Sequence, residues 1–188
     1  MQGLNCAHEI TAKSINGLNI SLTPVSMDGL EGFHQYSMRP ELYEHLEFPP
    51  FQNLEDSQKY LEKLIYRSSF PEAQYWFIRL GRENKVVGTI CLHSLHVRRA
   101  SVEIGYGLSP IYWGKGIFTS AAKMIIDYSF NELSIRRIMA RTSVRNIASL
   151  RGLERLGFQI EGVMRDYYRM STGEWIDAAL LSKLSTDK

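Results

Sequence analysis

A pair of glycines stands directly before a long helical pattern, in the run Trp113-Gly114-Lys115-Gly116-Ile117-Phe118-Thr119. Glycine lacks a Cβ atom, so Gly114 and Gly116 let the backbone adopt left-handed dihedral angles and let a bulky anion approach closely. The first N–H groups of a helix have no intrahelical acceptor and carry roughly half a positive charge, which stabilises a phosphate group there. Lys115 adds a cation. The run predicts an anion site, although the same pair also fits an ordinary turn before a core helix.

Two common nucleotide-binding loops do not match this run. The P-loop has the pattern G-x-x-x-x-G-K-[ST], which occurs nowhere in the sequence. The dinucleotide-binding fingerprint requires a further glycine or alanine three residues after the second glycine, and Thr119 stands in that place. The sequence therefore argues against both classes of nucleotide-binding protein.

The histidines and cysteines do not form a recognisable metal or redox motif. His93 and His96 lie three residues apart at the end of a predicted strand, which is not in itself a recognisable zinc-ligand spacing. Cys6 and Cys91 are the two cysteines of the chain, and neither belongs to a C-x-x-C pair. No Ser/His/Asp signature is present. We therefore predict no metal site and no disulfide framework.

Length and composition fit one globular enzyme-sized domain. The chain has 188 residues, 44% of them hydrophobic, which is enough for one full core and too few for a second domain. A net charge of +2 is too small to indicate a nucleic-acid surface. We see no basic and apolar leader and no run of about eighteen apolar residues. We expect a cytoplasmic protein that binds neither nucleic acid nor membrane.

The N-terminal half alternates between strand-like and helical patterns. We expect a flexible leader or short preliminary strand over residues 1–17, a strand over 18–24, and a helix that begins at Ser26 or Asp28 and ends near Met38. Asn53, with Asp56 three residues later, predicts the N-terminal cap of a helix over 54–68. Between the two helices, the segment 39–51 contains two consecutive prolines and predicts an irregular, substrate-facing loop.

The C-terminal half predicts most of a sheet. The expected elements, in order, are strands over 75–80, 86–92 and 102–108, a helix over 118–133, a strand over 137–142, a helix over 148–156 closed by Gly157, and strands over 158–170 and 175–184. Such an order indicates a mixed α/β sheet in a single domain over residues 18–184, with 185–188 as a tail.

Several short motifs together resemble the GNAT superfamily of N-acetyltransferases. They occur in the family's order and spacing over nearly the whole chain: Glu103 to Tyr106, Trp113 to Gly116, Asn146 to Ser149, Leu156 to Phe158, Glu161-Gly162 and Trp175 to Asp177. The branch that acetylates the N-termini of ribosomal proteins is the most similar. The resemblance implies an acyl-CoA N-acyltransferase fold, with a splayed mixed sheet of about seven strands and about four helices. It also implies direct transfer from acetyl-CoA to a primary amine.

The resemblance assigns the glycine-rich run to the diphosphate of coenzyme A. The residues expected to bind the cofactor there are Trp113, Gly114, Lys115, Gly116, Ile117, Phe118 and Thr119. Phe118 occupies a place where the family has glycine or alanine. Lys115 and Arg145 are further candidates to pair with phosphate oxygens.

In the family, a bulge in the strand over 102–108 frees a backbone N–H that polarises the thioester carbonyl. Gly105 or Gly107 suits such a bulge, and the resemblance assigns the N–H to Tyr106 or Leu108. The strand is therefore expected to bind acetyl-CoA, in a cleft shared with the strand over 137–142.

The attacking amine must be neutral, and this requirement bears on the choice of acceptor. An α-amino group ordinarily has a pKa of about 8 and a lysine-like amine one of about 10.4, so the α-amino group is far easier to deprotonate. By its position in the strand and by the resemblance, Glu103 is the expected base, acting through a water molecule. Glu44, Glu47 and His45 are alternatives.

The residue that would donate a proton or a hydrogen bond to the leaving thiolate differs here from that of many family members. Those proteins place a tyrosine where this chain has Leu153. Ser149 corresponds to a serine of the ribosomal-type branch and is expected to hydrogen-bond the sulfur. Asn146 is expected to bind the pantetheine amides, to cap the following helix, or both.

The acceptor itself is left open by the sequence. The first hypothesis is a protein α-amino group, with Tyr43, Glu44, His45 and Phe48 as candidate substrate-binding residues. A small amine such as a polyamine, amino sugar or aminoglycoside is the alternative. A third hypothesis is an acyl-CoA-binding module without catalytic activity. Either a monomer or a homodimer is compatible with the sequence.

Overall fold

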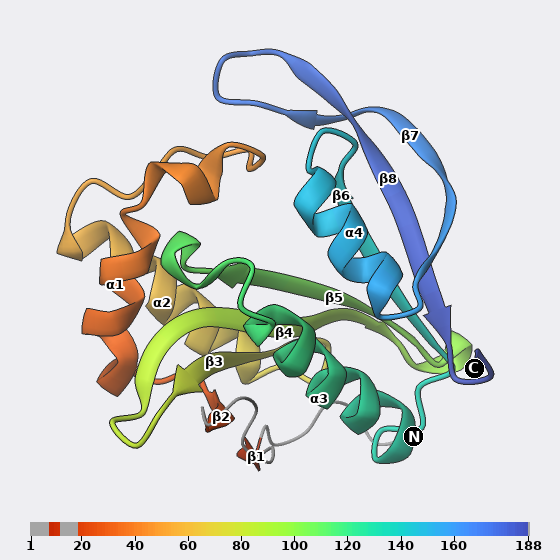
Figure 1. Cartoon of the computed structure of the whole chain (residues 1–188), viewed down its shortest axis with the longest axis horizontal. Helices are drawn as coiled ribbons and strands as arrows, with labels where there is room; N and C mark the ends of the chain where they lie inside the picture. Colours follow the sequence, from red (N-terminus) through yellow and green to blue (C-terminus); the bar gives the residue numbers. More distant parts are fainter. Residues whose placement is uncertain (1–7, 12–18, 188) are drawn as a thin grey trace.

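The computed structural model describes residues 8–11 and 19–187, and these residues form one mixed sheet flanked by helices (Figure 1). The strand order is β1-β2-β3-β4-β5-β6-β8-β7, and β5–β6 is the parallel pair while the others are antiparallel. The strands are β1 (Ile10–Thr11), β2 (Ile20–Pro24), β3 (Gln74–Leu80), β4 (Lys85–His96), β5 (Ser101–Leu108), β6 (Arg137–Ser143), β7 (Gln159–Arg169) and β8 (Trp175–Leu184). The helices are α1 (Leu30–Ser37), α2 (Leu54–Ser68), α3 (Ile117–Asn131) and α4 (Ile147–Arg155). None of the described helices is long and apolar enough to cross a membrane.

The predicted order of strands and helices is confirmed, and so is the fold class. β1, of two residues, adds a short eighth strand to the seven expected. Most of the expected leader, residues 1–7 and 12–17, lies outside the described residues, as do Leu18 and Lys188. The N–H of Asp56 donates to Asn53 Oδ1 at 2.9 Å, which confirms the predicted cap of α2.

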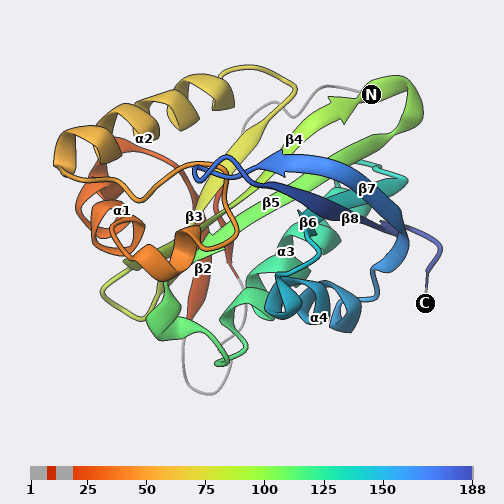
Figure 2. The ribbon, with the colours of Figure 1, turned by 90° about the horizontal axis from the view of Figure 1, so that it is seen from above.

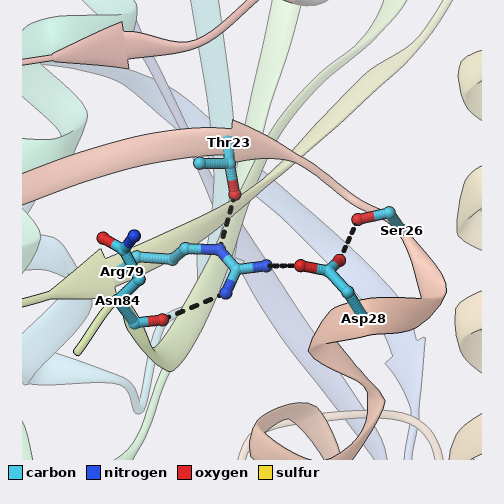
Figure 3. A network of polar contacts seen from close by, with 5 residues as sticks. All are labelled: Thr23, Ser26, Asp28, Arg79 and Asn84. Carbon is cyan, nitrogen blue, oxygen red and sulfur yellow. Dashed lines mark hydrogen bonds and ion pairs between the residues drawn. The ribbon is translucent and has the colours of Figure 1, made fainter.

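The predicted helix over 26–38 is divided in the structure. A 3₁₀ turn over Met27–Gly29 precedes α1. Arg79, on β3, donates to Asp28 Oδ2 at 2.7 Å, to Thr23 Oγ1 at 2.8 Å and to the Asn84 carbonyl at 3.0 Å (Figure 3). The Ser26 hydroxyl donates to the same aspartate. Arg79 thus holds Asp28 against β3, and the chain enters α1 through this tighter turn.

The two faces of the sheet bury separate cores. Trp76 and Ile78 point to the face covered by α3, where Ala121, Ile125 and Leu153 are fully buried. Phe77, between them on β3, points to the opposite face and packs with Phe33, Tyr36, Leu61 and Leu64 of α1 and α2. Figure 2 shows the two pairs of helices on opposite sides of the strands.

β5 and β6 separate soon after they pair. Their parallel register covers three pairs, which end at Glu103↔Met139. Beyond that point β5 continues along β4, and β6 continues along β8. The strands therefore diverge after Glu103, as Figure 1 shows for green β5 and cyan β6, and the expected splayed sheet is confirmed.

The predicted bulge at Gly105 or Gly107 is wrong. The β4–β5 register runs without interruption from Gly88↔Leu108 to His93↔Glu103. An irregularity lies instead on β4 between His93 and His96, where Ser94 has a φ of 55°. Gly105 has a packing role, since a Cβ added there would stand 2.9 Å from Cys91 Sγ.

Candidate functional site

The glycine-rich run begins α3 and leaves its first N–H groups available. Gly114 and Gly116 have φ of 71° and 76°, and a Cβ at either would have no neighbour within 4 Å. Glycine is thus required there by the backbone conformation rather than by crowding. The first intrahelical bond runs from the Ser120 N–H to the Gly116 carbonyl at 3.0 Å. The N–H groups of Ile117, Phe118 and Thr119 precede it and have no intrahelical acceptor, so the geometry fits a diphosphate.

Trp113 ties this run to the end of β5. Its Nε1–H donates to the Leu108 carbonyl at 2.7 Å, although the side chain is half exposed. Lys115 places Nζ 5.4 Å from the centre of the Tyr112 ring. The tryptophan therefore positions the loop, and the lysine stays at its exposed rim.

Phe118 is accommodated by a glycine on the neighbouring helix. Its ring centre lies 4.2 Å from that of Tyr106. A Cβ at Gly152 would come within 2.9 Å of Phe118 Cε1. The phenyl ring therefore occupies the space between α3 and α4 that Gly152 leaves, which explains how a bulky side chain fits at this position.

The backbone of β5 presents N–H donors on the side where β6 diverges from it. The Ser109 N–H donates to the Val87 carbonyl at 2.8 Å, so residues 87 and 109 form a hydrogen-bonded pair of the antiparallel ladder. Because such pairs alternate, the N–H groups of Tyr106 and Leu108 point away from β4. The bond from Trp113 to the Leu108 carbonyl agrees with this direction. Both residues expected to bind the cofactor thus present their N–H groups on the side where β6 has separated.

Two hydroxyl groups meet across the divergence. The Tyr106 and Ser149 oxygens are 2.6 Å apart, and burial raises the pKa of Tyr106 to about 12. Asn146 Oδ1 accepts the Ser149 N–H at 3.0 Å, which confirms its predicted role as the cap of α4. Leu153 is fully buried in the core and presents no group to the site.

Glu103 lies on the opposite face of the sheet. Its side chain shares a face with Gly105 and Gly107 by alternation, and a Cβ at Gly107 would lie 3.9 Å from Leu42 of the segment 39–51. Glu103 is 7% exposed, and its carboxylate binds Arg141 through both oxygens, with Arg141 Nε 2.7 Å from Oε1. These bonds raise the pKa of Arg141. The expected base is therefore buried and already paired with a cation.

His93, Arg141 and Tyr168 lie on this face and were not predicted as site residues. His93 stands opposite Glu103 in the β4–β5 register, and burial lowers its pKa, so the imidazole is neutral at pH 7. Arg141 also lies 5.1 Å from the centre of the Tyr167 ring. Burial raises the pKa of Tyr168 to about 12, and its hydroxyl lies near the charges of Arg141, Glu103 and Glu47. No local pattern in the sequence pairs any of the three with Glu103, because that pairing depends on contacts between strands.

The segment 39–51 contributes less to this face than expected. Tyr43 is buried, its hydroxyl donates to the Ser37 carbonyl at 2.5 Å, and its ring packs on Phe48 and Phe51, so the side chain is held inside the segment. Phe48 lines a shallow aromatic hollow with Phe51 and Tyr60. Glu44 is exposed and His45 half buried.

A hydrogen bond joins this segment to the C-terminal hairpin. The Arg169 N–H donates to Glu47 Oε1 at 3.3 Å. The expected phosphate contact of Arg145 is less well supported, because its guanidinium donates to Glu174 Oε1 at 2.7 Å, at the turn before β8. The segment and the hairpin therefore border the face that carries Glu103.

The sequence and the fold match known acetyltransferases. The family model described as acetyltransferase (GNAT) domain matches residues 19–159. An uncharacterized N-acetyltransferase, p20, from Bacillus licheniformis is 28% identical over 168 residues, which cover 89% of this chain and 94% of the relative. A spermidine N(1)-acetyltransferase from Escherichia coli (strain K12) is 25% identical over 151 residues, covering 80% and 78%. A ribosomal-protein-S5-alanine acetyltransferase from Vibrio fischeri has a similar crystal structure, with a TM-score of 0.78, 25% identity and coverage of 95% and 98%.

Proposed function

Because this chain belongs to the GNAT family of acetyltransferases, we propose that it transfers the acetyl group of acetyl-CoA directly to the α-amino group of a protein N-terminus. The observation that carries the proposal is the divergence of β5 and β6 immediately after Glu103. Two sets of groups flank this divergence from opposite faces of the sheet. The Tyr106–Ser149 pair and the start of α3 lie on one face, and Glu103, Arg141 and His93 lie on the other.

The donor side has the groups that acetyl-CoA requires. The free N–H groups at the start of α3 suit the diphosphate, and the N–H groups of Tyr106 and Leu108 suit the pantetheine amides and the thioester carbonyl. An N–H aimed at the carbonyl oxygen is worth most in the transition state, because negative charge develops there. Asn146 and Ser149, at the start of α4, border the same space.

The acceptor side favours an amine that loses its proton easily. Glu103 is the buried carboxylate of this face, and Arg141 already neutralises it. A polyamine carries two or more positive charges, and a carboxylate that a guanidinium already neutralises attracts them less. An α-amino group has a pKa near 8, so about a tenth of it is neutral at pH 7 without a strong base. The Glu103–Arg141 pair, with His93 opposite, can then receive the remaining proton through water.

The spermidine-acetylating relative makes a small amine the second candidate acceptor. Release of CoA from acetyl-CoA, followed over a panel of peptides with free N-termini, polyamines and aminoglycosides, separates the two. We expect turnover with peptides and none with the same peptides carrying a blocked N-terminus. Turnover confined to polyamines or aminoglycosides would contradict the proposed acceptor. Binding of acetyl-CoA without release by any amine would instead identify a module without catalytic activity.

A further inference from the structure

We propose that Tyr106 is a positioning residue, which holds the Ser149 hydroxyl so that its proton points at the thioester sulfur and stabilises the thiolate that leaves. The inference rests on the proposed function, since it needs acetyl-CoA at the divergence of β5 and β6. It assigns to the Tyr106 side chain a role separate from that of its backbone N–H.

The two hydroxyls are held in place from opposite sides of the divergence. Tyr106 belongs to β5, and Ser149 lies in the first turn of α4, which directly follows β6. Their oxygens are 2.6 Å apart. The Tyr106 ring is fixed against Phe118, and Phe118 is fixed against Gly152. Ser149 is fixed through its own N–H, which the Asn146 side chain accepts. Neither hydroxyl needs to be ordered when the substrate binds.

The position of the sulfur follows from the geometry of a thioester. The carbonyl oxygen and the sulfur are bonded to the same carbon. If the N–H of Tyr106 binds the oxygen, the sulfur lies within a few ångströms of the Tyr106 backbone, on the side of β5 where β6 and the following helix α4 lie. The Tyr106–Ser149 pair is the hydroxyl pair that the described residues place there.

The direction of the hydrogen bond follows from the acidity of the two groups. A phenol is a stronger donor than an aliphatic alcohol, so Tyr106 donates and Ser149 Oγ accepts. The single proton of Ser149 is then free to point elsewhere. A phenol with a pKa of about 12 does not protonate a thiolate whose parent thiol has a pKa of about 8.5, so Tyr106 keeps its proton throughout.

The reaction balances without a proton from either hydroxyl. The amine nitrogen forms a bond to the carbonyl carbon, and the C–S bond then breaks with its electron pair on sulfur. The proton lost by the nitrogen passes to the Glu103 face and to water. The thiolate leaves with a hydrogen bond from Ser149 and takes a proton from solvent.

The acidity of bound CoA tests this inference without any acceptor. We would titrate the thiolate absorbance of CoA in complex with the wild type, with Tyr106→Phe, which keeps the ring, and with Ser149→Ala. Tyr66→Phe on the exposed surface of α2 is the control. We expect the thiol pKa of bound CoA to fall below the free value of about 8.5 in the wild type and control, and to rise by roughly one unit in both other variants. With the best acceptor, Tyr106→Phe should lower kcat about tenfold and leave KM for acetyl-CoA unchanged.

The outcomes separate this inference from the proposed function. CoA binding with the same thiol pKa in all four proteins would overturn the role of the hydroxyl pair and leave the acetyltransferase proposal intact. Failure of the wild type to bind CoA would overturn both. A higher thiol pKa in Ser149→Ala with an unchanged one in Tyr106→Phe would overturn the positioning role of Tyr106. If Tyr106→Phe does not fold, an unchanged thiol pKa in Ser149→Ala would still contradict the inference, because the hydrogen bond to the sulfur is assigned to Ser149.

Discussion

The phenyl ring of Phe118 occupies the volume that the missing side chain of Gly152 leaves open, with Cε1 2.9 Å from where a Cβ would stand. α3 and α4 are therefore in close contact at the site, and Phe118 carries that contact on to Tyr106. A residue that is unusual in a glycine-rich phosphate loop is thus compensated by a glycine thirty-odd residues later, in the interior of a helix, where glycine costs roughly 1 kcal/mol relative to alanine.

Gly152→Ala tests this compensation. Alanine is the better helix former, so an isolated helix would gain about 1 kcal/mol. Because the new methyl group overlaps Phe118, we expect instead a net loss of about 1–2 kcal/mol in the free energy of unfolding and weaker binding of acetyl-CoA. Combining it with Phe118→Leu should recover part of the stability. A Gly152→Ala protein with a higher Tm than the wild type would contradict the contact.

If the glycine-rich run Trp113 to Thr119 binds the diphosphate, its positive φ angles predict a specific loss of CoA affinity in a variant. Gly116→Ala forces alanine into a left-handed conformation and should cost about 1–2 kcal/mol of stability. Gly81, in the β3–β4 turn, has a φ of 70° and equally open surroundings, so Gly81→Ala is a matched control. We expect equal losses of Tm in the two variants and a loss of acetyl-CoA affinity of at least tenfold in Gly116→Ala alone. Calorimetric titration with acetyl-CoA measures the difference, and equal affinities would exclude the loop from binding.

Sequence patterns within a few residues of one another predicted the helices and strands, and they predicted several features of the face where we propose that acetyl-CoA binds. The caps at Asn53 and Asn146 and the left-handed glycines depend on residues within a few positions of one another, so a single sequence contains them. Glu103 could be placed on its strand because the alternation of side chains along a strand is also a local pattern. Contacts between strands are not local. Arg141 reaches Glu103 across 38 positions, through a parallel register of three pairs that no local pattern specifies.

The wrong bulge and the unforeseen burial of Tyr43 have the same origin. Glycine in a strand fits either a bulge or a close neighbour, and at Gly105 the neighbour, Cys91, is on another strand. The prolines around Tyr43 predict an irregular loop, and nothing in their spacing shows that the tyrosine is buried. Its burial results from Phe48 and Phe51, which fold back over it in a way that the proline spacing does not determine. Hydrophobic packing within an irregular segment therefore limited the prediction of the acceptor side.

Glu103→Gln separates the chemical role of this carboxylate from its structural one. Loss of the charge leaves the partly buried Arg141 without its anionic partner, so we expect some loss of stability. If Glu103 takes the amine proton, kcat should also fall about 100-fold with little change in acetyl-CoA affinity. Glu161→Gln is the matched control, because it disrupts the Arg137–Glu161 pair on the same sheet away from the divergence. An unchanged kcat in Glu103→Gln would remove Glu103 from the reaction.

The buried His93 predicts a pH dependence of stability in a defined window. Burial lowers its pKa in the folded protein, so the unfolded chain, with a histidine pKa near 6.5, binds a proton more readily. The unfolded state therefore holds more protons below that value, and stability must fall as the pH drops through about 6.5 until the folded pKa is reached. The carboxylates with lowered pKa, Asp28, Glu161 and Glu174, titrate at more acid pH and act outside this window.

Between pH 7.5 and 5.5 we expect Tm to decline in the wild type and to decline less in His93→Gln, measured by calorimetry in buffers of equal ionic strength. Parallel declines in the two proteins would mean that the imidazole is not desolvated in the folded state, and would remove His93 as a neutral proton acceptor beside Glu103.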